Sequence, residues 1–130
     1  MALRCFIVDD SPHFLTAAQT LLEREGCAVV GVASTTEEAL RRMADADPDV
    51  VLVDVNLGSE SGFDLAQRFQ REATVDQSRV ILISTYAEED LWELLGAAPA
   101  AAYLPKSQLS AIAIRRILDG TQDQSGPRSP

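Results

Sequence analysis

The sequence predicts an α/β fold: an open, doubly wound sheet of five parallel strands with helices on both faces. Short apolar runs alternate five times with stretches in which apolar residues recur at the helical period. One apolar run, VVLVDVNLG at residues 50–58, opens with four apolar residues in succession, which is typical of a strand buried on both faces. Strands that alternate with helices in this way build parallel sheets.

The first two strand–helix pairs are marked by apolar runs and by capping residues. The strands are expected at residues 3–8 and 29–33. A helix at residues 11–25 is expected to be capped by Ser11 and to end at Gly26. The segment STTEE at residues 34–38 contains two overlapping capping boxes, so a second helix is expected to start there.

The remaining elements follow the break DPD at residues 47–49. We expect strands at residues 50–53, 80–84 and 101–104. We expect helices at residues 63–72, 88–97 and 109–118, and a loop at residues 58–62. Ser107 is expected to cap the last helix and Gly120 to end it.

Length and composition restrict the function classes. A chain of 130 residues is the size of one domain, expected at residues 1–120, with a disordered tail or linker stub at residues 121–130. The net charge of −9 argues against direct binding of nucleic acid. Neither an apolar run near the ~18 residues of a membrane span nor a signal peptide is recognisable, so we expect a cytoplasmic domain without a membrane partner. Cys5 and Cys27 are expected to be buried reduced thiols, and the lone His13 is not expected to bind metal.

Reactive side chains follow four of the five predicted strands. They are Asp9 and Asp10 after the first strand, Asp54 after the third, Ser84 and Thr85 at the fourth, and Lys106 after the fifth. Because the carboxyl ends of parallel strands meet at one edge of a doubly wound sheet, we expect these groups to share one site. Each group alone has an ordinary explanation, since an aspartate after a strand is commonly a turn residue or a helix cap. Their arrival at one edge favours a functional site.

The chemistry of this predicted site follows from its charges. Three carboxylates in one cleft repel one another, so either a cation or retained protons must offset them. Their hard oxygen atoms suit Mg²⁺ or Mn²⁺ better than zinc. With the charge offset, Asp54 is able to act as a nucleophile and form an acyl phosphate. Lys106 and the Ser84 hydroxyl would then bind the other phosphoryl oxygens, so we predict that these three residues carry the chemistry.

The same residues identify a family. Over about residues 1–120 the chain resembles the receiver domain of two-component response regulators, a domain of flavodoxin-like topology with strand order 2-1-3-4-5. The residues that match the family's order and spacing are Asp9, Asp10, Asp54, Gly62, Ser84, Tyr103 and Lys106. Each match alone is weak, but several matches in register on a fivefold strand–helix pattern are specific.

The resemblance implies a role for each site residue. Asp54 would accept a phosphoryl group from a sensor histidine kinase or a phosphotransfer protein. Asp10, Asp54 and the backbone carbonyl of Asn56 would bind Mg²⁺, with Asp9 acting through water. Lys106 would assist the transfer. The domain would be a signalling module that assists its own phosphorylation and dephosphorylation, and not an enzyme with a separate substrate.

The resemblance also implies a switch. New oxygens at Asp54 would attract the Ser84 hydroxyl, and the Tyr103 ring would fill the space that this hydroxyl vacates. Thr85 and Tyr86 flank the site and would affect hydrolysis of the acyl phosphate. Three residues depart from the commoner choices of the family. Gly58 and Ser107 stand where the family often has proline, and Ser84 stands where threonine is more common.

Protein contact is the expected output. The chain resembles the receivers of helix-turn-helix regulators of the LuxR and NarL type, yet no output domain is expected within it. A downstream protein, or a second copy in a homodimer, is expected to bind the surface of the fourth helix, fifth strand and fifth helix. The residues expected on that surface are Trp92, Leu95, Tyr103 and Ile112.

Three alternatives remain open. A phosphatase with an aspartate nucleophile usually needs a second acid two residues later, where this chain has Asn56. A cofactor module of the flavodoxin type needs a phosphate-binding loop after the first strand, where Asp9 and Asp10 would repel a phosphate. A degenerate receiver would fold but act by protein contact alone, an alternative that the intact set of site residues disfavours.

Overall fold

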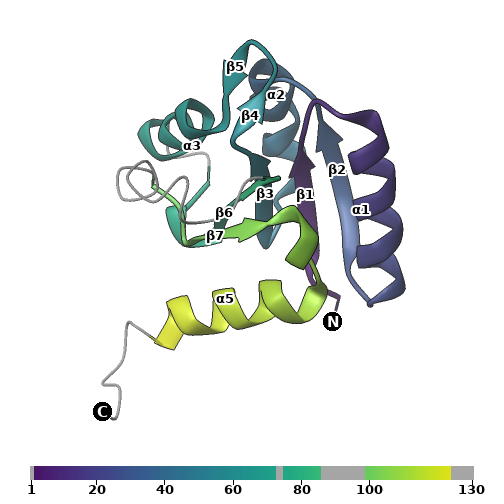
Figure 1. The fold of residues 1–130 in the computed structure, drawn as a ribbon. Helices are drawn as coiled ribbons and strands as arrows, with labels where there is room; N and C mark the ends of the chain where they lie inside the picture. Colours follow the sequence, from purple (N-terminus) through teal and green to yellow (C-terminus); the bar gives the residue numbers. More distant parts are fainter. Residues whose placement is uncertain (1, 73–74, 86–98, 124–130) are drawn as a thin grey trace.

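The computed structural model describes residues 2–72, 75–85 and 99–123. Its centre is a five-stranded sheet in the order β2-β1-β3-β6-β7, in which every neighbouring pair is parallel (Figure 1). The strands are β1 (Arg4–Val8), β2 (Ala28–Ala33), β3 (Val50–Asp54), β6 (Val80–Ser84) and β7 (Ala102–Pro105). Numbered along the chain, the strands of this sheet have the order 2-1-3-4-5, which confirms the predicted topology.

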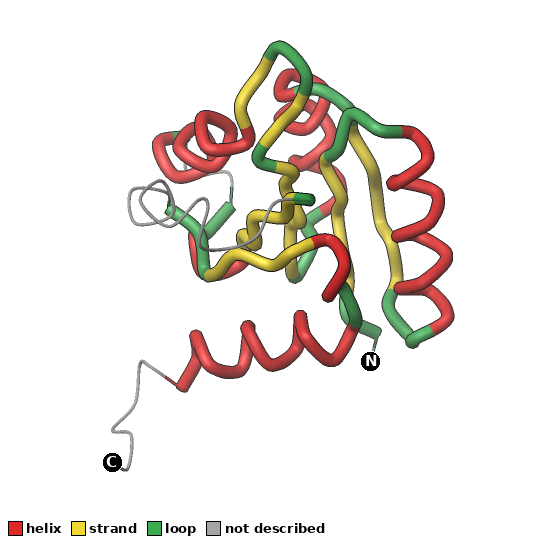
Figure 2. The backbone as a smooth tube through the Cα atoms, viewed as in Figure 1, coloured by secondary structure: helices red, strands yellow, loops and turns green. Residues whose placement is uncertain are grey.

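Helices cover both faces of the sheet (Figure 2). The helices are α1 (Pro12–Arg24), α2 (Thr36–Ala46), α3 (Gly62–Arg71) and α5 (Ala111–Asp123), with the short 3-10 helices η1 (Gln77–Arg79) and η3 (Lys106–Gln108). Side chains of α1 and α5 share one hydrophobic cluster, and those of α2 and α3 share another. Successive residues of a strand point to opposite faces, so Phe6 of β1 packs with α2 and α3 whereas Ile7 packs with α1 and α5.

The starts of the first two helices agree with the predicted caps. Ser11 caps α1, because its hydroxyl accepts a hydrogen bond from the backbone N–H of Phe14. Thr35 caps α2 in the same way through the backbone N–H of Glu38. The Glu38 carboxylate accepts a hydrogen bond from the backbone N–H of Ser34, the residue before the cap. The helix therefore starts from Thr35, and the capping box expected from Ser34 to Glu37 is not formed.

One segment predicted as a loop is partly ordered into strands. The predicted loop at residues 58–62 overlaps a short antiparallel hairpin formed by β4 (Asn56–Leu57) and β5 (Glu60–Ser61). Gly58 has a φ of 73°, a left-handed conformation that glycine adopts without strain, and it lies in the turn of the hairpin. Two-residue strands are too short to show an alternating pattern, so hydrophobic periodicity does not reveal them.

The last helix begins and ends later than predicted. Ser107 lies in η3 and does not cap α5, so that prediction is wrong. Ser110 takes the capping role, because its Oγ accepts a hydrogen bond of 3.0 Å from the backbone N–H of Ala113. The prediction that Gly120 ends the helix is also wrong, since α5 continues to Asp123. A glycine ends a helix where its backbone turns left-handed, and Gly120 does not do so.

Several sequence-based predictions lie outside the described residues. They concern the helix at residues 88–97 with Trp92 and Leu95, the site-flanking Tyr86, and residues 124–130 of the predicted tail. Within the described part of the chain, no helix has the length and apolar character needed to cross a membrane.

Gly62 allows the start of α3 to pass directly beside the end of β3. Its backbone N–H donates a hydrogen bond of 3.0 Å to the carbonyl oxygen of Val55. A Cβ atom at Gly62 would overlap the backbone carbonyl of Asp54. Any larger residue at position 62 must therefore push the backbone of α3 away from the backbone at the end of β3, and both are held by tight packing.

We predict that Gly62→Ala lowers the free energy of unfolding by about 1–3 kcal/mol, because the added methyl group overpacks a backbone contact. Gly120→Ala is the matched control: it lies within α5, and a Cβ there would meet nothing within 4 Å. Alanine is the better helix former, so the control should gain about 0.5–1 kcal/mol. Urea unfolding of the two variants measures both values, and equal stabilities would contradict the close approach at Gly62.

Candidate functional site

Three carboxylates and one ammonium meet at the carboxyl edge of the sheet. Asp9 directly follows β1, Asp54 is the last residue of β3, and Lys106 follows β7. The ladder between β1 and β3 pairs Val8 with Val53, so the two aspartates leave the sheet at the same level. Oxygen atoms of Asp9, Asp10 and Asp54 all lie within 4.8 Å of one another.

Lys106 lies between the two buried carboxylates. Its Nζ is 2.6 Å from Oδ2 of Asp9 and 3.2 Å from Oδ2 of Asp54. Burial alone would lower the pKa of this ammonium, but the hydrogen bonds and charges of Asp9 and Asp54 outweigh burial and raise the pKa. Lys106 is therefore a fixed positive charge inside the site at neutral pH.

Asp54 is the carboxylate with the most perturbed environment. It is 6% exposed, and its Oδ1 accepts a hydrogen bond of 3.1 Å from the backbone N–H of Asn56. Desolvation raises the pKa of Asp54 to about 6, with the Asp9 charge acting in the same direction. The Asn56 hydrogen bond and Lys106 lower the pKa but do not cancel these effects. Asp54 is thus largely ionised at neutral pH, at a cost in stability.

Asp9 is completely buried and only partly satisfied. Its Oδ1 accepts a hydrogen bond of 2.8 Å from the backbone N–H of Ser11. Its Oδ2 forms an ion pair with Lys106, whose Nζ lies 2.6 Å away. Apart from this ammonium, no group of the described residues donates a hydrogen bond to Oδ2, so this oxygen has an accepting position left.

The site fits a small, hard divalent cation. The donor set consists of oxygen atoms from Asp9, Asp10 and Asp54, which Mg²⁺ prefers over nitrogen or sulfur. Asp10 is exposed, so its carboxylate lies on the side from which an ion would enter. The incompletely satisfied Oδ2 of Asp9 is the kind of buried acceptor that an ion or its bound water completes.

The hairpin that follows β3 closes one side of the site. A Cβ atom on Gly58 would lie 3.2 Å from Oδ2 of Asp10, so the hairpin turn lies against this carboxylate. Glu60 ties the hairpin to α2, because its Oε1 accepts a hydrogen bond of 2.8 Å from the backbone N–H of Thr36. Sequence reasoning missed Glu60, since it belongs to no motif and its partner lies 24 residues away.

Phe14 is a second residue near the site to which sequence reasoning gave no site role. It lies within the helix expected at residues 11–25. In the structure its ring centroid lies 4.2 Å from the Nζ of Lys106. The sequence feature that could have linked Phe14 to the site is its position in the first turn of the helix that follows the acidic pair.

The remaining predicted site residues are divided between the site and its surroundings. Ser84 ends β6, next to β3, and is 1% exposed. Tyr103 is 9% exposed and packs with the hydrophobic cluster on the α2 and α3 side. Thr85 and Asn56 are exposed, which places both at the surface beside the site. Their predicted roles stay predictions.

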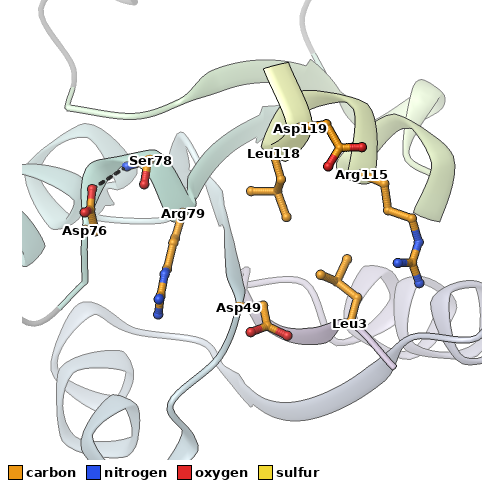
Figure 3. A pocket seen from close by; sticks show the side chains of 8 residues that line it. All are labelled: Leu3, Asp49, Asp76, Ser78, Arg79, Arg115, Leu118 and Asp119. Carbon is orange, nitrogen blue, oxygen red and sulfur yellow. Dashed lines mark hydrogen bonds between the residues drawn. The ribbon is translucent and has the colours of Figure 1, made fainter. Parts of the chain in front are cut away.

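A separate hollow lies at the opposite edge of the sheet. It has a volume of about 430 Å³ and is lined by residues that precede strands, including Leu3, Asp49 and Arg79, and by Leu118 of α5 (Figure 3). None of the predicted site residues lines it. The carboxylates around Asp54, and not this hollow, hold the perturbed groups that mark a functional site.

A family model for the response regulator receiver domain matches residues 5–117. The chain belongs to this family. The matched range contains Asp9, Asp54 and Lys106, so the family assignment and the carboxylate cluster concern the same part of the molecule.

Individual relatives support the assignment. The receiver domain is 33% identical over 122 residues to the uncharacterised transcriptional regulatory protein YvfU of Bacillus subtilis, covering 91% of this chain and 60% of that protein. It is 30% identical over 105 residues to the response regulator GacA of Pseudomonas viridiflava, covering 80% of this chain and 48% of that protein. The chain thus spans about half to three-fifths of the length of these two relatives.

Solved structures have the same fold. The receiver domain of the putative response regulator NarL of Mycobacterium tuberculosis is 26% identical, with a TM-score of 0.74 over 93% of this chain and 97% of that chain. A response regulator of the LuxR family from Aurantimonas is also 26% identical, with a TM-score of 0.78 over 92% of this chain and 87% of that chain.

The raised pKa of Asp54 predicts a pH-dependent gain of stability in Asp54→Asn. The folded pKa of about 6 exceeds the unfolded value of about 4. The ionised carboxylate therefore destabilises the fold above pH 6, and this cost disappears below pH 4. Without divalent metal, Asp54→Asn should be about 1–3 kcal/mol more stable than wild type at pH 7.5 and equal to it at pH 4.

Chemical denaturation at several pH values measures this difference. Asp45→Asn, on the exposed surface of α2, controls for the loss of one negative charge from an acidic protein. A gain that does not depend on pH, or one that the control shares, would contradict the raised pKa.

Proposed function

We propose that this receiver domain accepts a phosphoryl group on Asp54 from a sensor histidine kinase or a phosphotransfer protein, and that phosphorylation changes its protein contacts. The observation that carries the proposal is the placement of the Asp54 carboxylate, 3.2 Å from Lys106 Nζ and within a cluster of three acids. A nucleophile, a fixed cation and a set of hard oxygen ligands are the parts that phosphoryl transfer to a carboxylate requires.

Asp54 is held in a geometry suited to attack. The Asn56 N–H binds Oδ1, while Oδ2 faces Lys106. In the proposed step a carboxylate oxygen of Asp54 attacks the phosphorus atom of a phosphohistidine. The new P–O bond forms as the P–N bond breaks, and the electron pair of that bond stays on the imidazole nitrogen. The Lys106 ammonium stabilises the charge on a phosphoryl oxygen.

Mg²⁺ is the cofactor that the donor set supports. Asp9, Asp10, Asp54 and the backbone carbonyl of Asn56 would hold it, with Asp9 acting through water. When bound, the ion would offset the repulsion between the carboxylates and the incoming phosphoryl oxygens. The protein's own contribution is to keep these oxygen atoms together at one sheet edge, where the hairpin beside Asp10 restrains them.

Ser84 and Tyr103 are the proposed switch. Ser84 lies at the end of the strand next to β3, since the β3–β6 ladder pairs Asp54 with Ile83. Tyr103 lies on the following strand, β7, which pairs Ser84 with Pro105. A hydroxyl drawn toward a phosphorylated Asp54 would leave room beside Tyr103, and the ring would move into it.

The output is proposed to be protein contact in the cytoplasm. Of the expected contact surface, the structure describes Tyr103 on β7 and Ile112 on α5, and Ile112 is 65% exposed. The relatives named above include a transcriptional regulatory protein that is longer than this chain. A role in transcription would therefore act through a partner or a further domain, because a domain of net charge −9 is poorly suited to bind nucleic acid itself.

Intact mass after incubation with acetyl phosphate and Mg²⁺ tests the proposal. We expect wild type to gain one phosphoryl group, and to gain none when EDTA removes the metal. Asp54→Asn should gain none under either condition, because it lacks the nucleophile. Asp45→Asn, which keeps the whole site, should behave as wild type.

Two results would argue against phosphorylation at Asp54. Uptake of phosphate by Asp54→Asn would place the acceptor elsewhere. Failure of wild type to gain a phosphoryl group and also to bind beryllofluoride, which mimics the acyl phosphate, would favour the degenerate receiver. Hydrolysis of ordinary phosphate monoesters, which are not phosphodonors for a receiver, would instead favour the phosphatase.

The switch makes its own prediction. Beryllofluoride should shift the ring resonances of Tyr103 in wild type, because the ring moves when the Ser84 hydroxyl is drawn to the site. In Ser84→Ala the shift should be small although beryllofluoride still binds, since the hydroxyl that links the two events is gone. NMR spectra of tyrosine-labelled protein measure this, and an unchanged shift in Ser84→Ala would remove Ser84 from the switch.

A further inference from the structure

The Lys106 ammonium has an aromatic neighbour besides its two carboxylates. The ring of Phe14 lies with its centroid 4.2 Å from Nζ, inside the range in which the negative face of a ring attracts a cation. Both residues are partly buried, so water weakens the attraction less than it would at an open surface.

Phe14 is held in this place by contacts that lead back to the site. Its backbone N–H donates a hydrogen bond of 3.3 Å to Oγ of Ser11, and the Ser11 N–H donates one of 2.8 Å to Oδ1 of Asp9. The other oxygen of Asp9 is the one that lies 2.6 Å from Lys106 Nζ. Asp9, Ser11, Phe14 and Lys106 therefore form a closed ring of contacts around the start of α1.

The Phe14 ring attracts the ammonium without carrying a formal negative charge, whereas one more carboxylate beside Lys106 would carry one. A lysine side chain is flexible and is readily drawn toward the nearest negative charge, here Asp9. The ring restrains the ammonium from one side without a formal charge of its own. It therefore leaves the positive charge available to a phosphoryl group at Asp54, whereas another carboxylate would neutralise it.

We propose that Phe14 is a positioning residue for phosphoryl transfer: its ring holds the Lys106 ammonium where it can stabilise a phosphoryl group on Asp54. This inference rests on the proposed function, since it concerns the rate of the same transfer. The first turn of α1 would then contribute to the site through Phe14, in addition to the acidic pair that precedes the helix.

Fluorinated phenylalanines at position 14 separate the ring's charge distribution from its shape. Mono-, di- and trifluorinated phenylalanine have nearly the same size, but each fluorine weakens the negative face of the ring. The rate constant for phosphorylation by acetyl phosphate should fall stepwise along the series, by about threefold to tenfold in total. The melting temperature should change little, because the packing is preserved.

Natural substitutions supply the matched comparison. Phe14→Tyr keeps an aromatic face and should retain most of the rate, whereas Phe14→Leu keeps an apolar side chain and should lose at least as much as the trifluorinated variant. Rates that are equal across the fluorinated series, or that follow side-chain size instead of fluorination, would overturn the positioning role.

A second readout does not depend on phosphorylation. Lys106 is the only lysine in the chain, so protein with isotope-labelled lysine has a single lysine side-chain spin system. The Phe14 ring should shift the Lys106 methylene protons nearest the ammonium upfield in wild type, and Phe14→Leu should abolish that shift. If wild type neither takes a phosphoryl group nor binds beryllofluoride, the proposed function fails, and the positioning role fails with it. The NMR shift still decides whether the ring contacts the ammonium. If wild type is phosphorylated but Phe14→Leu reacts at the same rate, only the positioning role fails.

Discussion

Two carboxylates are buried beside one ammonium at the carboxyl edge of the sheet, and the surrounding elements have to hold these charges together. Asp9 is fully buried, Asp54 is 6% exposed, and Lys106 lies within 3.2 Å of both. Removing an acid from water is costly unless a charge or a hydrogen bond compensates for it. One lysine cannot fully compensate two carboxylates, so the pKa of Asp54 is raised to about 6. The negative charge that Lys106 leaves uncompensated would be offset by a bound cation.

The sheet and its connections supply the rigidity that such a site needs. Parallel pairing of β1, β3 and β6 brings Asp9, Asp54 and Ser84 to one edge, and apolar clusters on both faces prevent the strands from shifting. The β4–β5 hairpin then restrains the open side, and Glu60 anchors it to α2. Backbone hydrogen bonds to Asp9 and Asp54 fix both carboxylates without neutralising them. The fold therefore holds the carboxylates close together although their charges repel one another.

Most of the fold could be predicted from local patterns, because strands and helices depend on short-range periodicity. The five strands of the sheet were placed within one or two residues, and Ser11 was identified as a cap from its residue type. The segment at residues 34–38 was identified as a helix start, and the structure shows that Thr35 is its cap. The hairpin at residues 56–61 was missed since its strands are too short to show a pattern. The end of α5 was misplaced because Gly120 was taken as a left-handed terminator, although a glycine is also tolerated within a helix.

The groups that reach the carboxyl edge of the sheet follow from the order of residues along the chain, because residues at the carboxyl ends of parallel strands lie at the same edge. This rule alone predicts that the edge holds Asp9, Asp10, Asp54, Ser84 and Lys106. Only the tertiary structure decided how these groups face one another: that Lys106 bridges Asp9 and Asp54, that Phe14 lies against the ammonium, and that Glu60 anchors the hairpin. Such contacts join residues far apart in the chain and depend on side-chain direction, which no local pattern encodes.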